Sequence, residues 1–172
     1  DVESGYLQKM LVTPVSRSAI LLGRLTSDAF RVTVQSLIIF GLAYLMGASA
    51  VTGIVGILLI LATIAFFGLA WSGISLAIGL RTKNAESVFG IGAFLTFPLL
   101  FMSTALTPLS FMPEWIQIVS NLNPISYTVN AVRALMLNGF EWSTILSAYA
   151  IIGLIAIVTM GITLYLFKKI IN

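Results

Sequence analysis

The sequence predicts an all-α, polytopic membrane protein with four transmembrane helices, a cytoplasmic amphipathic segment before them and an external re-entrant helical hairpin. Three observations predict this fold. Of the 172 residues, 59% are hydrophobic and 9% are charged, with a mean hydropathy of +1.06, whereas a soluble domain carries about 25% charged residues. Four apolar stretches are long enough to be spans. All but one of the nine lysines and arginines would lie on one side of the membrane.

The amphipathic segment covers residues 1–31. Its first part carries a short apolar face formed by Leu7, Met10 and Leu11. Pro14 then favours the first turn of a new helix, because its missing N–H would be unpaired there anyway. We therefore expect two consecutive helices in this segment.

Three arginines recur every seven residues in the second of these helices, at Arg17, Arg24 and Arg31, so they stay close to one face. Asp28 is spaced to pair with Arg24 or with Arg31. Two interpretations of the segment remain open. It is either a basic helix that rests on the anionic inner leaflet, or a docking surface for a cytoplasmic partner.

Four stretches match the roughly 20 apolar residues that a helix needs to cross a bilayer. Asn84 is placed to cap the third of them, and Pro98 to kink it. The second has no charged residue and is long enough that it should tilt or protrude. We expect the spans at residues 32–50, 54–80, 87–107 and 143–167.

The basic residues orient these spans. The side of the membrane that collects lysine and arginine is cytoplasmic, so both ends of the chain are expected in the cytoplasm. Arg133 alone falls on the outside. Because the chain begins at Asp1 without a signal-peptide pattern, we interpret it as a fragment of a longer protein. The residues on the cytoplasmic side are Lys9, Arg17, Arg24, Arg31, Arg81, Lys83, Lys168 and Lys169.

Residues 108–142 are too apolar for an ordinary loop and too broken for a span. Pro113 favours the start of a helix, and Asn123–Pro124 breaks that helix and can start another. The second helix should end near Gly139, a typical C-cap residue. Two short helices that return to the same side make a re-entrant hairpin. Such irregular backbone survives at membrane depth only where protein or a water-filled cavity surrounds it.

Arg133 is the one charged residue within the second helix of this hairpin. It either reaches the outer headgroups or pairs with Glu114 or Glu141. Alternatively, its planar guanidinium bonds backbone carbonyls that are freed near Asn123–Pro124, and so holds the hairpin in shape.

Composition excludes several classes of function. The absence of Cys and His removes disulfides, Cys/His metal sites, thiol nucleophiles and histidine acid–base chemistry. No acidic residue lies in the middle of a span, which disfavours a membrane-embedded enzyme and a proton- or sodium-coupled carrier. We therefore predict no catalytic residue and no metal site. The basic residues flank spans, so they do not indicate nucleic acid. A gated channel remains an alternative, although no filter sequence is present.

Two separated motifs carry a resemblance to a known family. The segment ESGYLQKMLVTPVSRSAILLGR resembles the cytoplasmic coupling segment of type-2 ABC exporter permeases, especially the daunorubicin-resistance type. The segment LTPLSFMPEWIQIVSNLNPISYTVNAVRALMLNG is similar to the signature that precedes the last span in that family. The resemblance covers essentially the whole chain, as a single domain over residues 1–172 that would hold the last four of six spans.

The resemblance implies a permease subunit that exports lipophilic, drug-like, lipid or polysaccharide substrates across the prokaryotic cytoplasmic membrane. It would bind no cofactor itself, because ATP and Mg²⁺ would be held by a separate ATPase subunit, and it would pair with a second permease copy. The sequence agrees in having no phosphate-binding loop of the G-x-x-x-x-G-K-[ST] type. The expected ATPase-coupling residues are Glu3, Gly5, Leu7, Met10, Leu11, Pro14 and Arg17. The expected residues of the external hairpin and gate are Pro108, Pro113, Trp115, Asn123, Pro124, Tyr127 and Arg133.

Overall fold

The computed structural model describes the backbone of residues 17–171 and the side chains of residues 23–166. Every regular element within this part of the chain is a helix, which confirms the all-α membrane fold. The long helices are α2 (Arg17–Leu45), α3 (Gly53–Thr82), α4 (Ala85–Phe101) and α7 (Trp142–Ile171). Between α4 and α7 lie the short elements η1 (Leu109–Phe111), α5 (Glu114–Leu122), α6 (Pro124–Arg133) and the π-helical turn η2 (Ala134–Asn138).

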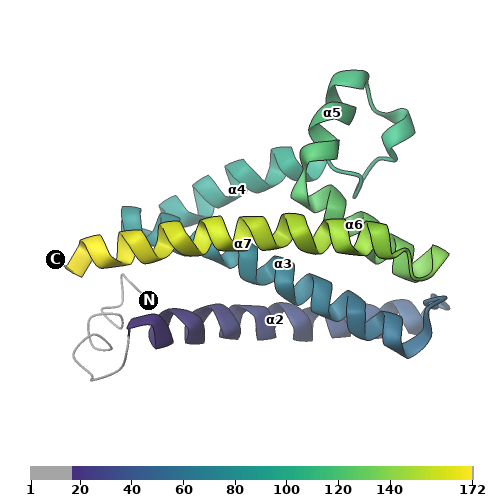
Figure 1. The fold of residues 1–172 in the computed structure, drawn as a ribbon, viewed down its shortest axis with the longest axis horizontal. Coiled ribbons are helices and arrows are strands. Elements are labelled where there is room, and N and C mark those ends of the chain that lie inside the picture. Colours follow the sequence, from purple (N-terminus) through teal and green to yellow (C-terminus); the bar gives the residue numbers. More distant parts are fainter. Residues whose placement is uncertain (1–16, 172) are drawn as a thin grey trace.

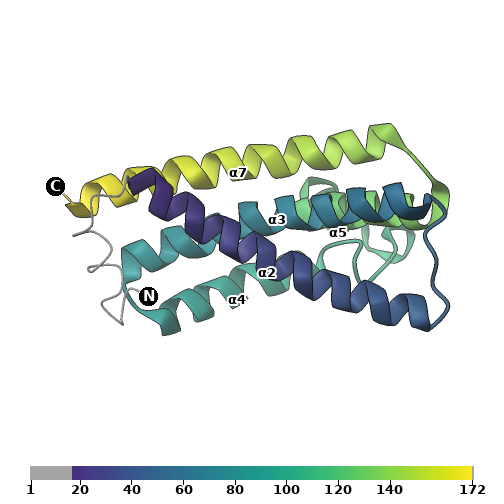
Figure 2. The same ribbon diagram turned by 90° about the horizontal axis from the view of Figure 1, so that it is seen from below.

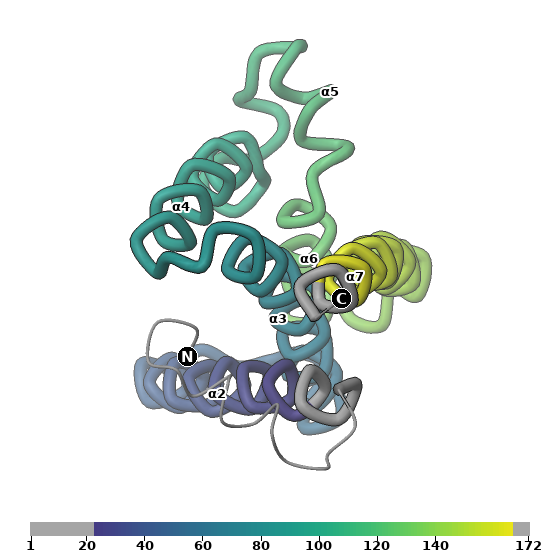
Figure 3. Tube along the Cα trace, turned by 90° about the vertical axis from the view of Figure 1, so that its left-hand side faces the viewer, coloured from purple at the N-terminus to yellow at the C-terminus, as the bar shows by residue number. Residues whose placement is uncertain are grey.

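Helix α3 is the centre of the bundle. It packs against α2 on one side and α7 on the other, and also contacts α4 and α6. Figure 1 shows α2, α3 and α7 running along the long axis, with α5 and α6 gathered toward one end. The α3–α4 connection lies at the other end, near the C-terminal end of α7 (Figure 2). Seen along the bundle, α3 separates α2 from α7, and α5 projects away beyond α4 (Figure 3).

Threonines on α7 bind the two longest helices together. Thr159 donates from Oγ1 to the Ala70 carbonyl at 3.4 Å, and Thr163 donates to the Gly73 carbonyl at 3.1 Å. Thr159 and Thr163 are both buried. Hydrogen bonds of this kind hold helices together where lipid supplies no hydrophobic driving force between them. Gly73 has no side chain, so the two backbones can approach this closely.

Two predicted span boundaries are wrong. The first span was expected at residues 32–50, separate from the amphipathic segment, but α2 runs without a break from Arg17 to Leu45. No helix-breaking residue separates the two parts. The chain turns at Gly47, whose φ of 92° suits glycine. Within α2, Asp28 pairs with Arg24 at 3.5 Å, one of the two partners that the spacing allowed.

The third span was expected to reach residue 107, but α4 ends at Phe101. Asn84 caps its start as predicted, accepting hydrogen bonds from the amides of Glu86 and Ser87. Pro98 lies in the last turn and not at a central kink. With 17 residues, α4 is about 25 Å long, whereas a hydrocarbon core is about 30 Å thick. Among the residues that the structure describes, three helices are long and apolar enough to span, and α4 is a shorter apolar helix.

Gly73→Ala should lower the melting temperature of the full-length protein in detergent by several degrees. A Cβ at this position would lie 2.7 Å from Thr159 Oγ1 and 3.1 Å from Thr159 Cβ, and threonine has little freedom at χ1. Overpacking of this kind costs about 1–3 kcal/mol. Gly161→Ala on α7 is the matched control, because a Cβ there meets nothing within 4 Å. Equal melting temperatures for the two variants would contradict this packing.

Candidate functional site

A polar stripe runs along one face of α6. Asn123, Ser126, Asn130 and Arg133 follow one another at intervals of three or four residues, the spacing that places side chains on one side of a helix. Each of these side chains bonds to α4's last turn or to the residues that follow it. The stripe therefore joins the hairpin to the end of a membrane helix.

Asn123 closes the end of α4. The Ser103 amide would continue the α-helical ladder to Leu99, but it bonds to the Leu100 carbonyl at 3.2 Å. The Leu99 carbonyl accepts instead from Asn123 Nδ2 at 2.6 Å. Asn123 Oδ1 accepts from the Ile125 amide at 3.0 Å, so the same side chain also caps α6. Asn123 is 1% exposed, and without this donor the half-buried Leu99 carbonyl would be left unpaired.

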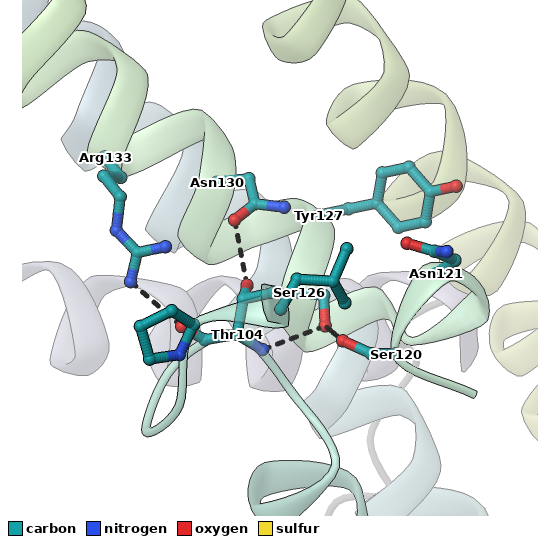
Figure 4. A pocket seen from close by; sticks show the side chains of 9 residues that line it. Thr104, Ser120, Asn121, Ser126, Tyr127, Asn130 and Arg133 are labelled. Atoms are coloured by element: carbon teal, nitrogen blue, oxygen red, sulfur yellow. Dashed lines mark hydrogen bonds between the residues drawn. The ribbon is translucent and has the colours of Figure 1, made fainter. Parts of the chain in front are cut away.

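Thr104 is held to α6 through all of its polar groups. Its amide donates to Ser126 Oγ at 3.2 Å, and its hydroxyl donates to Asn130 Oδ1 at 2.9 Å. Its carbonyl accepts from Arg133 Nη2 at 2.9 Å. Ser126 Oγ also lies 3.0 Å from Ser120 Oγ, which ties in the end of α5. Figure 4 shows these bonds converging on one short segment of backbone.

The far end of α6 is held by the connection between α2 and α3. In η2 the Gly139 amide bonds to the Ala134 carbonyl at 2.8 Å, one residue further back than in an α-helix. The carbonyls of Leu135 and Met136 then accept from Thr52 Oγ1 at 2.6 Å and from the Val51 amide at 3.0 Å. The second helix of the hairpin therefore contacts α4 at its start and the α2–α3 connection at its end.

A small pocket of about 250 Å³ opens beside the stripe. Its lining is a mixture of apolar and polar groups, and it contains one cation, no acidic residue and several amide and hydroxyl groups. In the part of the chain that the structure describes, no three His, Cys, Asp or Glu residues are grouped to hold a metal ion. The side chains of α6 fix the position of the backbone at Thr104, and they present hydrogen-bond donors to the pocket. The lining residues are Thr104, Pro108, Leu109, Ser120, Asn121, Ser126, Tyr127, Asn130 and Arg133.

The predicted hairpin residues separate into three groups. Pro108, Tyr127 and Arg133 line the pocket. Asn123 and Pro124 form the joint between α5 and α6, as the sequence predicted, with Pro124 at the first position of α6. The other two are Pro113, which is the N-cap of α5 and not its first residue, and Trp115, which is 60% exposed.

The structure matches one of the predicted accounts of Arg133 in part. It does bond a freed backbone carbonyl, but that carbonyl belongs to Thr104 and does not lie near Asn123–Pro124. No ion pair joins it to Glu114 or Glu141 in the described residues, and Glu141 instead accepts from Asn138 and Thr144.

Of the predicted coupling residues, Glu3, Gly5, Leu7, Met10, Leu11 and Pro14 lie outside the described residues. Arg17 begins α2, but its side chain is not described. The prediction missed Thr104, Ser120 and Ser126. A signal for Ser126 was present in the sequence, because the spacing from Arg133 to Asn130 extends backward to Ser126 and Asn123.

Residues 1–137 match the family described as "ABC-2 type transporter". A "Putative transport permease ycf38" of Pyropia yezoensis is 33% identical over 140 residues, which cover 78% of this chain and 46% of the relative. The "Daunorubicin resistance ABC transporter permease protein DrrB1" of Streptomyces coeruleorubidus is 31% identical over 136 residues, or 79% of this chain and 48% of the relative.

A "Probable doxorubicin resistance ABC transporter permease protein DrrC" of Mycobacterium tuberculosis is 28% identical over 135 residues, or 78% of this chain and 49% of the relative. The chain thus spans about half the length of the curated relatives it matches. No solved structure matches it significantly.

Asn123→Ala should destabilise the full-length protein by about 1–3 kcal/mol, because it leaves the half-buried Leu99 carbonyl without its donor and removes the cap of α6. The measurement is the melting temperature in detergent. Asn121→Ala is the matched control, since Asn121 is exposed and its side chain has no hydrogen bond in the structure. A loss of stability no larger than that of the control would show that Asn123 does not close α4.

Proposed function

The chain belongs to the ABC-2 type transporter family, and from this premise we propose that it is the permease part of an ATP-driven exporter. The full-length protein would move a lipophilic, drug-like, lipid or polysaccharide substrate out of the cell by alternating access. The observation that carries the proposal is the family match over residues 1–137. Support for a drug-like substrate comes from relatives that are named for daunorubicin and doxorubicin resistance.

Energy would come from a partner. The sequence has no phosphate-binding loop of its own, so a separate ATPase subunit would hold ATP and Mg²⁺. The N-terminal segment would be its docking site, through Glu3, Gly5, Leu7, Met10, Leu11, Pro14 and Arg17. Closure of the ATPase dimer would then move this segment and switch the permease between its conformations. A second copy of the permease would complete the pathway.

We place this permease in the prokaryotic cytoplasmic membrane with both ends in the cytoplasm. Arg81 and Lys83 lie at the connection between α3 and α4, at the opposite end of the bundle from the hairpin (Figure 1). Since basic residues collect on the cytoplasmic side, the hairpin would face outside.

In this orientation the hairpin would be the outer gate. Its second helix contacts α4 through the polar stripe and the α2–α3 connection through Thr52. Movement of α3 or α4 relative to α2 would therefore displace the hairpin directly. On its open side, α5 presents the exposed apolar residues Trp115, Ile118 and Leu122, which suit contact with lipid or with a lipophilic substrate.

Leu7→Asp combined with Leu11→Asp should abolish stimulation of the partner ATPase and stop export, while the protein still inserts into the membrane. Each buried leucine contributes about 1.5–3 kcal/mol to an interface, and a buried carboxylate adds a further cost. The measurement is ATP hydrolysis and substrate export by the full-length complex in proteoliposomes, at matched protein amounts.

Gln8→Asp is the control, because Gln8 lies between the two leucines in sequence but largely off their face. It should leave both activities near the wild-type level. Normal ATPase stimulation by the doubly substituted protein would contradict docking through this face. Substrate flux that continues without ATP would instead favour a gated channel.

A further inference from the structure

We propose that the pocket beside the α6 stripe binds the phosphate group of a membrane lipid headgroup. The pocket is about 250 Å³ in volume and lies between the start of α6, the end of α5 and the segment after α4 (Figure 4). The proposal does not depend on ATP coupling or on the identity of the exported substrate, because it concerns only what this pocket holds.

The pocket has unused hydrogen-bond donors. Arg133 is exposed and uses Nη2 to bond the Thr104 carbonyl, whereas a guanidinium carries five N–H groups. Asn130 accepts from the Thr104 hydroxyl through Oδ1, and its Nδ2 has no partner in the structure. Arg133 and Asn130 therefore have donors free for a ligand.

Acceptors are scarce by comparison. No acidic residue lines the pocket. Ser126 Oγ already accepts from the Thr104 amide and contacts Ser120 Oγ. A cation beside several free donors, with no anion to balance it, favours an anionic oxygen ligand. A phosphate suits this set, because its oxygens can engage the planar fork of arginine and the neighbouring amide together.

The size of the pocket indicates a headgroup and not a complete drug. Sites for drug-sized ligands occupy about 300–1,000 Å³, so this pocket falls below that range.

The surroundings indicate a lipid as the source of the phosphate. Phe111, Ile118 and Leu122, on the elements that flank the pocket, are 79%, 66% and 77% exposed. In a membrane protein such residues can contact acyl chains while the headgroup phosphate lies beside Arg133 and Asn130 in the pocket.

The test is a titration of the purified full-length protein in detergent with water-soluble, short-chain phosphatidylglycerol, followed by the melting temperature. Parallel titrations use inorganic phosphate and an uncharged short-chain diacylglycerol. Phosphatidylglycerol should raise the melting temperature by several degrees and diacylglycerol should not. The apparent affinity for phosphatidylglycerol should exceed that for inorganic phosphate at least tenfold.

Two variants locate the effect. Arg133→Gln removes the cation, and Asn130→Asp replaces the free donor with an acceptor while keeping an oxygen for the Thr104 hydroxyl. Each should weaken the response to phosphatidylglycerol at least tenfold. Arg81→Gln, which removes an exposed arginine at the other end of the bundle, should respond like the wild type.

Three results would contradict the proposal in whole or in part. An undiminished response in both pocket variants, or equal responses to phosphatidylglycerol and diacylglycerol in the wild type, would overturn the site. Equal affinity for phosphatidylglycerol and inorganic phosphate, with loss in both pocket variants, would support a phosphate site but overturn the lipid as its source.

Discussion

The arrangement depends on one constraint, which is that the carbonyls at the end of α4 and just after it must find hydrogen-bond donors where the chain at Ser103 and Thr104 is buried. An unpaired backbone group in hydrocarbon costs several kcal/mol. Helix α4 has 17 residues and is about 25 Å long, which is shorter than a hydrocarbon core of about 30 Å. Asn123 donates to Leu99 and Arg133 donates to Thr104, so the α6 stripe supplies what water would supply elsewhere. The hairpin packs beside the bundle through these hydrogen bonds to the end of α4 and to Thr104.

The same requirement recurs at the other end of α6. The π-helical turn leaves the carbonyls of Leu135 and Met136 to be bonded by the α2–α3 connection. Gly56 makes this geometry accessible, because any Cβ there would overlap the Thr52 side chain that reaches Leu135. Two parts of the chain that are distant in sequence, the end of α4 with the residues after it and the α2–α3 connection, thus bond to the same helical segment. These hydrogen bonds are the physical reason to regard the hairpin as coupled to the long helices α2, α3 and α4.

Much of the fold follows from local rules, and the sequence therefore predicted it. Composition identified the membrane class, Asn84 identified the start of α4, and Asn123–Pro124 identified the joint of the hairpin. The end of α4 was mispredicted because Met102 and Leu106 continue the apolar pattern after the helix has stopped. Hydropathy alone cannot locate such an end, since it is set by donors from a helix more than twenty residues away. The pocket was missed for the same reason, because Thr104 finds its hydrogen-bond partners only when α6 packs beside it.

The most direct test of this account is hydrogen–deuterium exchange resolved to the Thr104 amide in the full-length protein. This amide donates to Ser126 Oγ, and both residues are buried. We expect slow exchange in the wild type and in Ser110→Ala, and exchange at least tenfold faster in Ser126→Ala, since loss of a bond worth about 1.4 kcal/mol changes a population tenfold. Equal exchange rates in all three proteins would show that the α6 stripe does not hold the end of α4.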